Sequence, residues 1–407
     1  MNILIVFPFL LHDEVRHGGA AQILRMSNAL RAKGHSIFLL SLSEYGWPCA
    51  GYSVETLKQK FNELRVFPLR RLTALTKFLV FVRPGLPSHV RNHINRDAQR
   101  YIHEMTTSGK IDIAYLVYTA TGEYSRSVNR SKCLVIVDTI EIETRKYEML
   151  LKTKISFVKW LHAKITYRRE KKYEKRLFES VDGVVVISPQ EKEFILGLCE
   201  QRNIKIVPSM IDTSTLGILN ANAESNSLLF FGSFGHAPNV DAILWFCAKV
   251  YPLICRRVPN VLLNIVGPQS IEIVGYLAGK QINVIGEVED LQAWIVDAAV
   301  VVSPIVSGAG SRIKNLEAMA MGKALVTTTL GADGLPEDEQ PCYLVADTET
   351  KFAEAVISLL KQPQVRTELG ARARKAIEEQ RNSGPICDAL VEWVEQLQVA
   401  RSENKPV

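Results

Sequence analysis

Short, uninterrupted runs of Val, Ile and Leu recur along almost the whole chain, and they limit the folds open to it. Examples are NILIVF near the N-terminus, CLVIVD in the middle of the first half, and SLLFFGS and AVVVSP in the second half. Strands buried on both faces have such continuous runs, whereas strands with one wet face alternate apolar and polar residues. Amphipathic stretches of helical period separate the runs, at 20–33, 189–199, 238–257 and 311–321. This repetition predicts an α/β protein with parallel sheets covered by helices on both faces.

The length of 407 residues suits two domains better than one. The segment 212–227 is rich in Asn, Ser, Thr and Ala, and it separates one series of strand candidates from the next. We therefore predict a doubly wound domain over 1–211, a linker over 212–227 and a second doubly wound domain over 228–383. The two domains are expected to face each other across a cleft. The final helical stretch, 384–407, lies beyond the last strand candidate and is a candidate to pack back on the first domain.

Composition excludes several classes of function. The net charge of +6 fits anionic small ligands or an anionic membrane surface, and it is too small to indicate nucleic acid as a partner. The seven cysteines lie far apart with no C-x-x-C pair, which argues against a zinc site and against a disulfide framework. The N-terminus lacks the basic region of a signal peptide, and no apolar run reaches the ~18 residues of a spanning helix. A cytoplasmic protein is expected.

The most informative motif is VVSPIVSGAGSRIKNLEAMAMG, residues 301–322. It begins with a strand candidate, and ligands bind at the carboxyl ends of strands in open α/β sheets. Gly308 and Gly310 allow a sharp turn and a close approach of the backbone to a ligand, because they lack a Cβ. Ser311 is a plausible N-cap of the helix that follows and runs to Gly322. A glycine turn that opens a helix presents unpaired N–H groups, which suits a phosphate.

Three charged residues follow this turn: Arg312, Lys314 and Glu317. The two cations are badly placed for the helix dipole but well placed for an anionic ligand. Glu317 lies among apolar residues, and its carboxylate can accept two hydrogen bonds from a vicinal diol such as a ribose. The alternative interpretation is a Lys314–Glu317 surface ion pair worth about 0.3 kcal/mol, which does not account for the glycine turn.

The segment GAGSRIKNLEAMAMGKALVTTTLGADGL resembles the nucleotide-sugar motif of the retaining glycosyltransferases of family 4. LLFFGSFGHAPNVDAILWF resembles the strand, loop and helix that open the donor domain of that family, and VLLNIVGP and HGGAAQILRMSNALRAKGH also match. The PNVDA form is similar to the branch that builds bacterial cell-surface polysaccharides. The resemblance covers nearly the full chain and is weakest between residues 50 and 130. It implies the GT-B fold, in which two Rossmann-like domains face each other across a cleft.

The resemblance implies roles for particular residues. Glu317 matches the family's ribose-binding glutamate, and the glycine turn with its basic neighbours matches the part that holds the diphosphate and the donor sugar. Gly18 and Gly19 match a glycine pair that faces the diphosphate from the first domain, although such a pair alone equally fits a plain turn. The donor-binding residues so implied are Gly18, Gly19, Gly232, Ser233, Gly308, Ala309, Gly310, Ser311, Arg312, Lys314 and Glu317.

The chain departs from the family's pattern at three donor positions. Ala309 stands where the family commonly has a second glutamate, so backbone amides or another residue must serve the donor sugar there. Ser233 stands where many members have an arginine. Many members also have a lysine a few residues further on, and this chain has none before Lys249. We therefore assign the charge that neutralises the diphosphate to Arg312 and Lys314.

On the acceptor side, members of the family often carry a histidine after the strand that matches CLVIVD. This chain has VDTIEIETRKY there, without a histidine. Asp138, at the strand end, is the preferred acceptor-side residue, with a role in orienting the attacking hydroxyl. A capping or turn role fits Asp138 equally well. His12 and His17, near the glycine pair, are further candidates.

Residues 145–176 carry 12 Lys or Arg against 3 Glu, with Phe157, Trp160 and Leu161 interleaved. A basic amphipathic helix with aromatic residues can lie on an anionic membrane, where each cation contributes ~1 kcal/mol. The alternative is a long solvated helix whose apolar stripe packs on its own domain. Under the first interpretation, the protein is attached peripherally to the inner face of the plasma membrane.

Together these features predict a retaining glycosyltransferase that moves a hexosyl unit from a nucleotide-diphosphate sugar to a growing, lipid-linked cell-surface glycan. Arg312, Lys314 and Asp138 are the candidate catalytic residues. No metal and no separate cofactor are expected, because fixed cations and helix N–H groups can neutralise the diphosphate. Two alternatives stay open: a nucleotide-sugar epimerase of the same fold, and a catalytically silent nucleotide-sugar-binding assembly partner.

Overall fold

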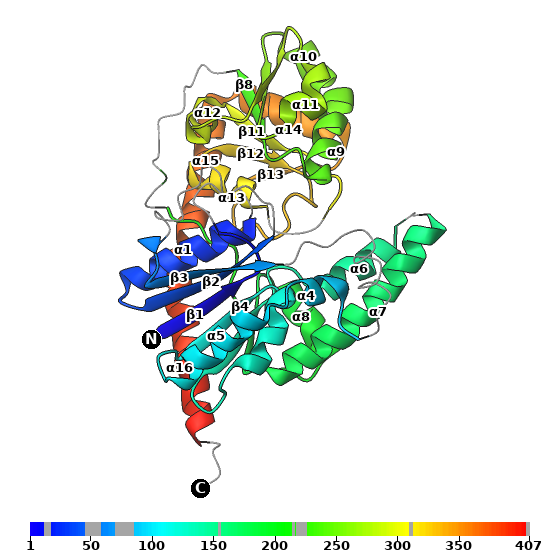
Figure 1. Ribbon diagram of the computed structural model, residues 1–407. Helices are drawn as coiled ribbons and strands as arrows, with labels where there is room; N and C mark the ends of the chain where they lie inside the picture. The colour runs from blue at the N-terminus through cyan, green and yellow to red at the C-terminus, as the bar shows by residue number, and fades with distance from the viewer. Residues whose placement is uncertain are drawn as a thin grey trace. The chain divides into compact units, whose positions relative to one another are not determined.

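The computed structural model describes residues 1–11, 18–44, 58–69, 85–153, 156–213, 216, 226–308 and 312–403. The chain divides into two compact units, one of Met1–Pro208 with Gly384–Val407 and one of Ser209–Ser383. Each unit is a parallel sheet flanked by helices (Figure 1). The chain therefore has the α/β class and the two doubly wound halves that the apolar runs predict.

The first unit is built on a seven-stranded sheet with the order β3-β2-β1-β4-β5-β6-β7. All residues of β4, β5 and β6 are buried, which accounts for the absence of polar alternation in their sequences. The strands are β1 (Asn2–Phe7), β2 (Ser36–Glu44), β3 (Glu63–Leu69), β4 (Ile113–Val117), β5 (Leu134–Asp138), β6 (Gly183–Val186) and β7 (Ile204–Ile206). The helices are α1 (Gly18–Ala32), α4 (Ser88–Asn92), α5 (Arg96–Thr107), α6 (Glu143–Leu151), α7 (Phe157–Ser180), α8 (Pro189–Leu198) and α16 (Ser383–Glu403), with a 3₁₀ stretch at Thr119–Ser127.

Strand β3 is one that the apolar pattern does not indicate. Its sequence, ELRVFPL, contains two charged residues and a proline. Because β3 is an edge strand, it leaves Arg65 and Pro68 exposed, and neither needs a partner strand on that side.

The second unit has a six-stranded sheet with the order β10-β9-β8-β11-β12-β13. The strands are β8 (Ser227–Phe231), β9 (Leu262–Val266), β10 (Ile282–Gly286), β11 (Val300–Ser303), β12 (Ala324–Thr327) and β13 (Leu344–Val345). The helices are α9 (Ala237–Trp245), α10 (Tyr251–Arg257), α11 (Ser270–Val274), α12 (Leu291–Asp297), α13 (Ile313–Ala320), α14 (Glu349–Lys361) and α15 (Pro363–Gln380), with a 3₁₀ turn at Gly275–Leu277. Buried aromatic rings from β8, α9–α10 and α14 meet in the core, where Phe246 contacts Phe352.

The helix predicted over 238–257 is not continuous. A π-helical turn, Phe246–Val250, separates α9 from α10. Pro252 stands at the start of α10 and has no N–H to donate, so the regular α-helical ladder cannot pass through it.

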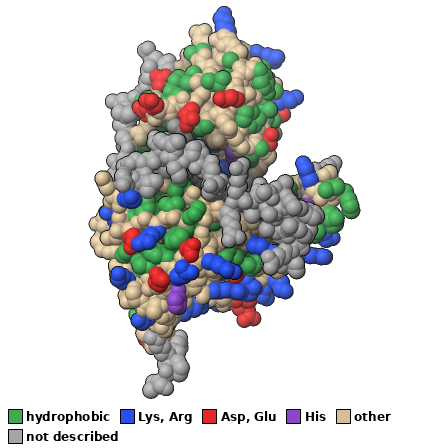
Figure 2. Space-filling view, viewed as in Figure 1, with side chains coloured by type: hydrophobic (Ala, Val, Ile, Leu, Met, Phe, Trp, Pro, Cys, Tyr) green, Lys and Arg blue, Asp and Glu red, His purple; other side chains and the backbone are tan. Residues whose placement is uncertain are grey.

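The basic stretch 145–176 forms two helices, α6 and α7, that pack against each other. The C-terminal half of α7 packs on the first unit through Tyr173, Leu177 and Phe178. Its N-terminal half extends away from the sheet (Figure 1), and Figure 2 shows hydrophobic and basic side chains together at that end. No helix in the described parts of the chain is both long and apolar enough to cross a membrane.

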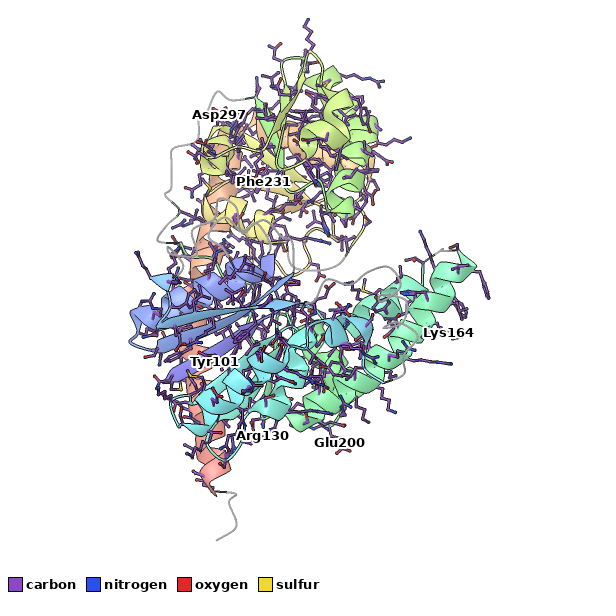
Figure 3. All side chains as sticks on the ribbon, viewed as in Figure 1. Tyr101, Arg130, Lys164, Glu200, Phe231 and Asp297 are labelled. Carbon is purple, nitrogen blue, oxygen red and sulfur yellow. The ribbon has the colours of Figure 1, made fainter. Side chains whose placement is uncertain are left out.

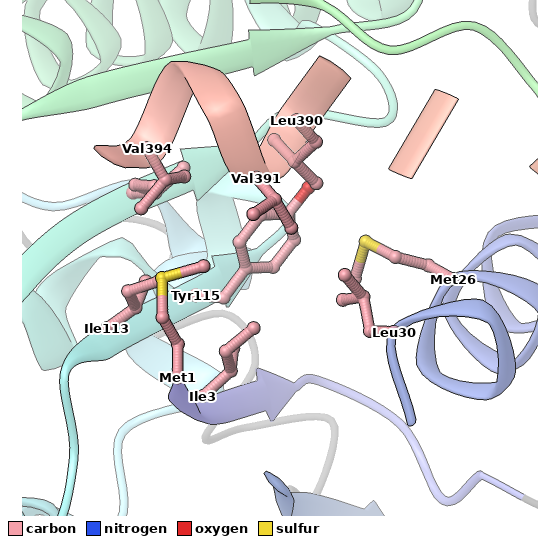
Figure 4. Close-up of a pocket in the computed structure, with 10 residues that line it drawn as sticks. Met1, Ile3, Met26, Leu30, Ile113, Tyr115, Leu390, Val391 and Val394 are labelled. Atoms are coloured by element: carbon pink, nitrogen blue, oxygen red, sulfur yellow. The ribbon is translucent and has the colours of Figure 1, made fainter. Parts of the chain in front are cut away.

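Helix α16 returns the end of the chain to the first unit. Leu390, Val391 and Val394 of α16 face Met26 of α1 and Tyr115 of β4 around a small apolar cavity (Figure 4). Cys387 is fully buried in the same region. Helix α16 therefore packs on the first unit through an apolar face.

Candidate functional site

In the second unit, the strand order reverses beside β8, whose neighbours are β9 on one side and β11 on the other. In open α/β sheets a crevice forms at such a reversal, outside the carboxyl ends of the strands, and ligands bind there. Gly232 follows β8, and the glycine turn follows β11. Phe231, the last residue of β8, is labelled in Figure 3. The topology thus brings two of the predicted donor segments to one edge of the sheet.

The backbone at Gly232 has a conformation that other residues rarely adopt. Its φ is 150°, and a Cβ there would lie 2.9 Å from Nδ2 of Asn239. The Asn239 side-chain amide donates a hydrogen bond of 2.8 Å to the backbone carbonyl of Ser233. Asn239 is buried, so its amide fixes the loop that connects β8 to α9.

Gly308 lies against the N-terminus of α9. Its φ is +89°, and a Cβ at this position would lie 2.5 Å from Cγ of Pro238. Ser307 donates a hydrogen bond of 2.7 Å to Asp241, which also belongs to α9. Both the backbone conformation and the available space therefore require glycine at this position, as expected for a sharp turn. The predictions for Ala309, Gly310 and Ser311 lie outside the described residues.

The side chain of Lys314, on α13, reaches Asn239 in the first turn of α9. Its ammonium donates a hydrogen bond of 2.8 Å to Oδ1 of Asn239 and lies 4.3 Å from the centroid of the Phe230 ring. Burial, together with the smaller effect of the Arg312 cation, lowers the pKa of Lys314 to about 7. A lysine that titrates near neutral pH can gain a full charge when an anion binds beside it.

Arg312 turns back onto the glycine turn. Its guanidinium donates a hydrogen bond of 3.1 Å to the backbone carbonyl of Gly308, and the side chain is buried. Burial lowers the pKa of Arg312, and the charge of Asp333 opposes that shift. The guanidinium therefore lies at the glycine turn, where its charge acts on Lys314.

The prediction that Ser311 caps the following helix is wrong. Helix α13 begins at Ile313, and Arg312 occupies the N-cap position without a side-chain capping bond. The Arg312 carbonyl already accepts hydrogen bonds from the N–H groups of Asn315 and Leu316, which fixes the start of the helix one residue later.

Glu317 lies one turn after Lys314 on α13 and is half-buried. The residues on both sides of it, Leu316 and Ala318, are fully buried, so the carboxylate emerges at the rim of the core. The Lys314 ammonium donates its hydrogen bond to Asn239, which differs from the alternative interpretation of a Lys314–Glu317 surface ion pair. Asn239 was assigned no role from the sequence, although it is the hydrogen-bond partner of Lys314. The only sequence signal near it is the absence of a lysine between Ser233 and Lys249.

In the first unit, the strand order reverses beside β1, between β2 and β4. Gly18 and Gly19 open α1 after β1, and Tyr118 follows β4. A Cβ on Gly19 would lie 2.9 Å from Cζ of Tyr118, so the tyrosine ring occupies the space beside the glycine pair. Tyr118 has a φ of 62°, which is strained for a residue with a side chain. The sequence does not indicate that Tyr118 lies beside the glycine pair.

Asp138 lies at the same edge of the first sheet. Tyr115 donates a hydrogen bond of 2.8 Å to one carboxylate oxygen, and the N–H of Ile140 donates one of 3.2 Å to the other. Asp138 is buried, and this burial raises its pKa to about 6, against the effect of both hydrogen bonds. The bond to Ile140, whose φ is 48°, has the form of the turn interaction considered for this aspartate.

Tyr118 also lies close to acidic groups. Burial raises the pKa of its hydroxyl, and the charges of Glu141, Asp138 and Glu143 raise it further. The backbone N–H of Tyr118 donates a hydrogen bond of 2.7 Å to the carbonyl of Asp138. Tyr118 and Asp138 are thus adjacent at the edge where Gly19 lies. Among the described residues, no three His, Cys, Asp or Glu side chains are grouped as metal ligands would be.

Comparison with known proteins places these sites in context. Residues 225–362 match the family model of the group 1 glycosyl transferases, and they contain β8, Gly232, Gly308, Lys314 and Glu317. An uncharacterized 44.6 kDa protein in the cps region of Klebsiella pneumoniae is 24% identical over 391 residues, which cover 92% of this chain and 95% of that protein.

Two solved structures resemble the fold over nearly the full chain. HepE of Anabaena, in complex with UDP and glucose, has a TM-score of 0.64 at 13% identity, with 97% of this chain and 100% of that chain covered. WaaG, a glycosyltransferase involved in lipopolysaccharide biosynthesis, has a TM-score of 0.61 at 16% identity, with 95% and 98% covered. The second unit thus contains a segment similar to the group 1 glycosyl transferases, and the chain as a whole has the GT-B fold.

Proposed function

We propose that the protein is a retaining hexosyltransferase that uses a nucleotide-diphosphate sugar and extends a lipid-linked cell-surface glycan. The observation that carries the donor side of the proposal is the hydrogen bond of 2.8 Å between Lys314 and Asn239 at the strand reversal. It fixes the Lys314 ammonium at the first turn of α9, whose Pro238 lies against Gly308 of the glycine turn. HepE, which resembles the chain in fold, was solved with UDP and glucose, and this supports a nucleotide sugar as the donor.

On the donor side, we assign the diphosphate to Lys314, Arg312 and the backbone around Gly308, and the ribose to Glu317. As the sugar departs, negative charge grows on the leaving diphosphate. Fixed cations in a crevice stabilise that charge without a reorganisation of solvent. The proposed reaction therefore needs no metal.

On the acceptor side, the proposal places the attacking hydroxyl at the edge that carries Gly19, Tyr118 and Asp138. The carboxylate of Asp138 already accepts two hydrogen bonds, so we assign it the role of fixing the loop that orients the acceptor. A lipid-linked glycan is proposed as the acceptor because the cps-region relative and WaaG point to surface polysaccharides. Such an acceptor would place the protein at the cytoplasmic face of a membrane.

The experiment is a panel of nucleotide sugars tested by thermal shift, followed by transfer with the donor that binds. A ligand at about 100 times its dissociation constant stabilises the folded protein by ~2.7 kcal/mol, which such a scan detects. Nucleotide release that depends on an added membrane extract supports transfer. Product formed from the donor alone would instead indicate an epimerase, and binding without any turnover would indicate a silent partner.

A further inference from the structure

The free end of the α6–α7 pair carries exposed apolar and basic side chains that the donor and acceptor sites do not use. We call this group the hairpin tip, and it comprises the exposed residues Met149, Leu150, Lys152, Phe157, Val158, Lys159 and Leu161 with the half-buried Trp160 and Lys164. Five of the sixteen exposed large hydrophobic side chains among the described residues fall here, within 149–161. Single exposed hydrophobic residues are ordinary, whereas a cluster on one element marks an interaction surface.

The most exposed members stand in the first turn of α7. Phe157 and Val158 are 73% and 77% exposed. The Phe157 ring stacks on Trp160 with centroids 6.2 Å apart, and the Lys164 ammonium lies 4.4 Å from the centroid of the Trp160 ring. Lys164 is labelled in Figure 3, and Figure 2 shows the hydrophobic and basic side chains of this end together. The tip therefore presents apolar and aromatic surface directly beside ammonium groups.

The rest of the two helices is held firmly. The buried carboxylate of Glu174, on α7, accepts hydrogen bonds of 2.9 and 3.0 Å from the N–H groups of Glu143 and Thr144 at the start of α6. Tyr173 donates a hydrogen bond of 3.0 Å to the carbonyl of Thr119 in the body of the first unit. The exposed residues thus stand at the end of a supported element.

We propose that the hairpin tip inserts into the interface of an anionic bilayer. Charge complementarity selects this occupant, because the sequence from Met149 to Lys164 contains lysines but no Asp or Glu. Phe157, Val158 and Leu161 enter the acyl boundary, and the lysines lie among the lipid phosphates with their stems along the apolar surface. Trp160 then lies at the level of the headgroups, where aromatic residues are enriched. The inference goes beyond sugar transfer, since it concerns the lipid surface alone.

The test is sedimentation of the full chain with vesicles of phosphatidylglycerol and phosphatidylcholine in equal parts, without donor or acceptor. The double variant Phe157→Ser/Val158→Ser is expected to lower the partition coefficient about tenfold or more. Its control, Tyr276→Ser/Val399→Ser, likewise removes one exposed aromatic residue and one exposed valine, but from other elements, and should leave binding unchanged. Brominated lipids should quench the fluorescence of the wild type, and Trp160→Phe should lose that quenching.

Three results would overturn the proposal. The first is tip-variant binding equal to wild type, and the second is an equal loss in Lys171→Glu/Lys172→Glu, which would indicate diffuse attraction by the whole basic stretch. The third is tip-dependent self-association without lipid, by sedimentation velocity, together with no vesicle binding. Each of these leaves the proposed transfer reaction untouched, because that reaction is assayed separately with donor and acceptor.

Discussion

At the scale of single residues, Lys314 differs most from an ordinary surface lysine. Its ammonium is held between the Asn239 amide oxygen and the face of the Phe230 ring, which leaves it few contacts with water. The sequence placed this cation beside a glycine turn but did not indicate its partner. Asn239 lies far away in the chain, and only the parallel arrangement of β8 and β11 brings the two side chains together.

The lowered pKa of Lys314 predicts a pH dependence of donor binding. In the free protein the ammonium loses its proton as the pH rises through about 7. A bound diphosphate favours the charged form, so binding above that pH requires proton uptake. A nucleotide sugar has no phosphate that titrates in this range. Affinity should therefore fall between about pH 7 and pH 9, by up to about tenfold per pH unit.

Titration calorimetry in buffers with different ionisation enthalpies measures this proton uptake. The variant Lys314→Met should bind more weakly and lose the slope. A wild-type affinity that is constant across this pH range would show that Lys314 does not contact the diphosphate.

Glu317→Ala should weaken nucleotide-sugar binding with little change in folding, because its half-buried carboxylate is assigned to the ribose hydroxyls. Loss of hydrogen bonds to a charged group costs about 1.5–3 kcal/mol, or roughly tenfold to a hundredfold in dissociation constant. Calorimetry measures the change, and Glu354→Ala on exposed α14 surface is the matched control. Equal affinity of Glu317→Ala and wild type, with the fold intact, would refute the ribose assignment.

Arg312→Ala and Lys314→Ala should reduce turnover more than donor affinity, since the charge that they neutralise grows in the transition state. The expected loss is on the order of 2–4 kcal/mol, or tens- to several-hundred-fold in rate. Steady-state kinetics with the identified donor and acceptor measures it. Because Arg312 is buried and bonded to Gly308, its removal also removes a hydrogen bond to the glycine turn. Arg312→Lys keeps the positive charge, so it serves as the control that separates loss of charge from loss of the turn. Near-wild-type turnover in both alanine variants would move the diphosphate cations elsewhere.

At the scale of elements, the sequence indicated most strands because a strand buried on both faces needs Val, Ile and Leu throughout. It did not indicate β3, where an edge position tolerates Arg65 and Pro68. It joined α9 and α10, because periodicity continues across the π turn although the hydrogen bonds change. It also placed the start of α13 one residue too early, because the N-cap position depends on backbone angles that the residue type alone does not determine.

Helix α1 and strand β4 meet where Gly19 lies against the Tyr118 ring, and this contact predicts an unusual response to mutation. An alanine inside a helix normally stabilises it relative to glycine by about 0.5–1 kcal/mol. Gly19→Ala should instead destabilise the first unit, by about 1–3 kcal/mol, because its Cβ would meet the tyrosine ring. Urea unfolding measures the change. In a Tyr118→Ala background the cost of Gly19→Ala should shrink by at least ~1 kcal/mol, and purely additive effects would contradict the contact.

At the scale of the whole molecule, the last helix stabilises the first unit although it follows the second unit in sequence. Leu390 of α16 is buried against that unit, so Leu390→Ala should cost about 2–5 kcal/mol. Calorimetry should show a lower melting transition for the first unit and an unchanged one for the second. Val399→Ala, at an exposed position of the same helix, should change stability by less than about 0.5 kcal/mol. Equal effects of the two variants would contradict this packing.

The return of the chain to the first unit has a consequence for protein engineering. The two ends of the second unit are hydrogen-bonded to each other: the N–H of Ile211 bonds to Arg381 at 2.7 Å, and the N–H of Ser383 bonds to Ile211 at 3.2 Å. The whole unit is therefore an insertion whose entry and exit are adjacent in space. Two junctions, near residues 210 and 383, suffice to exchange it as a cassette between related chains. Under the proposed division of roles, such recombination changes the donor sugar and keeps the acceptor.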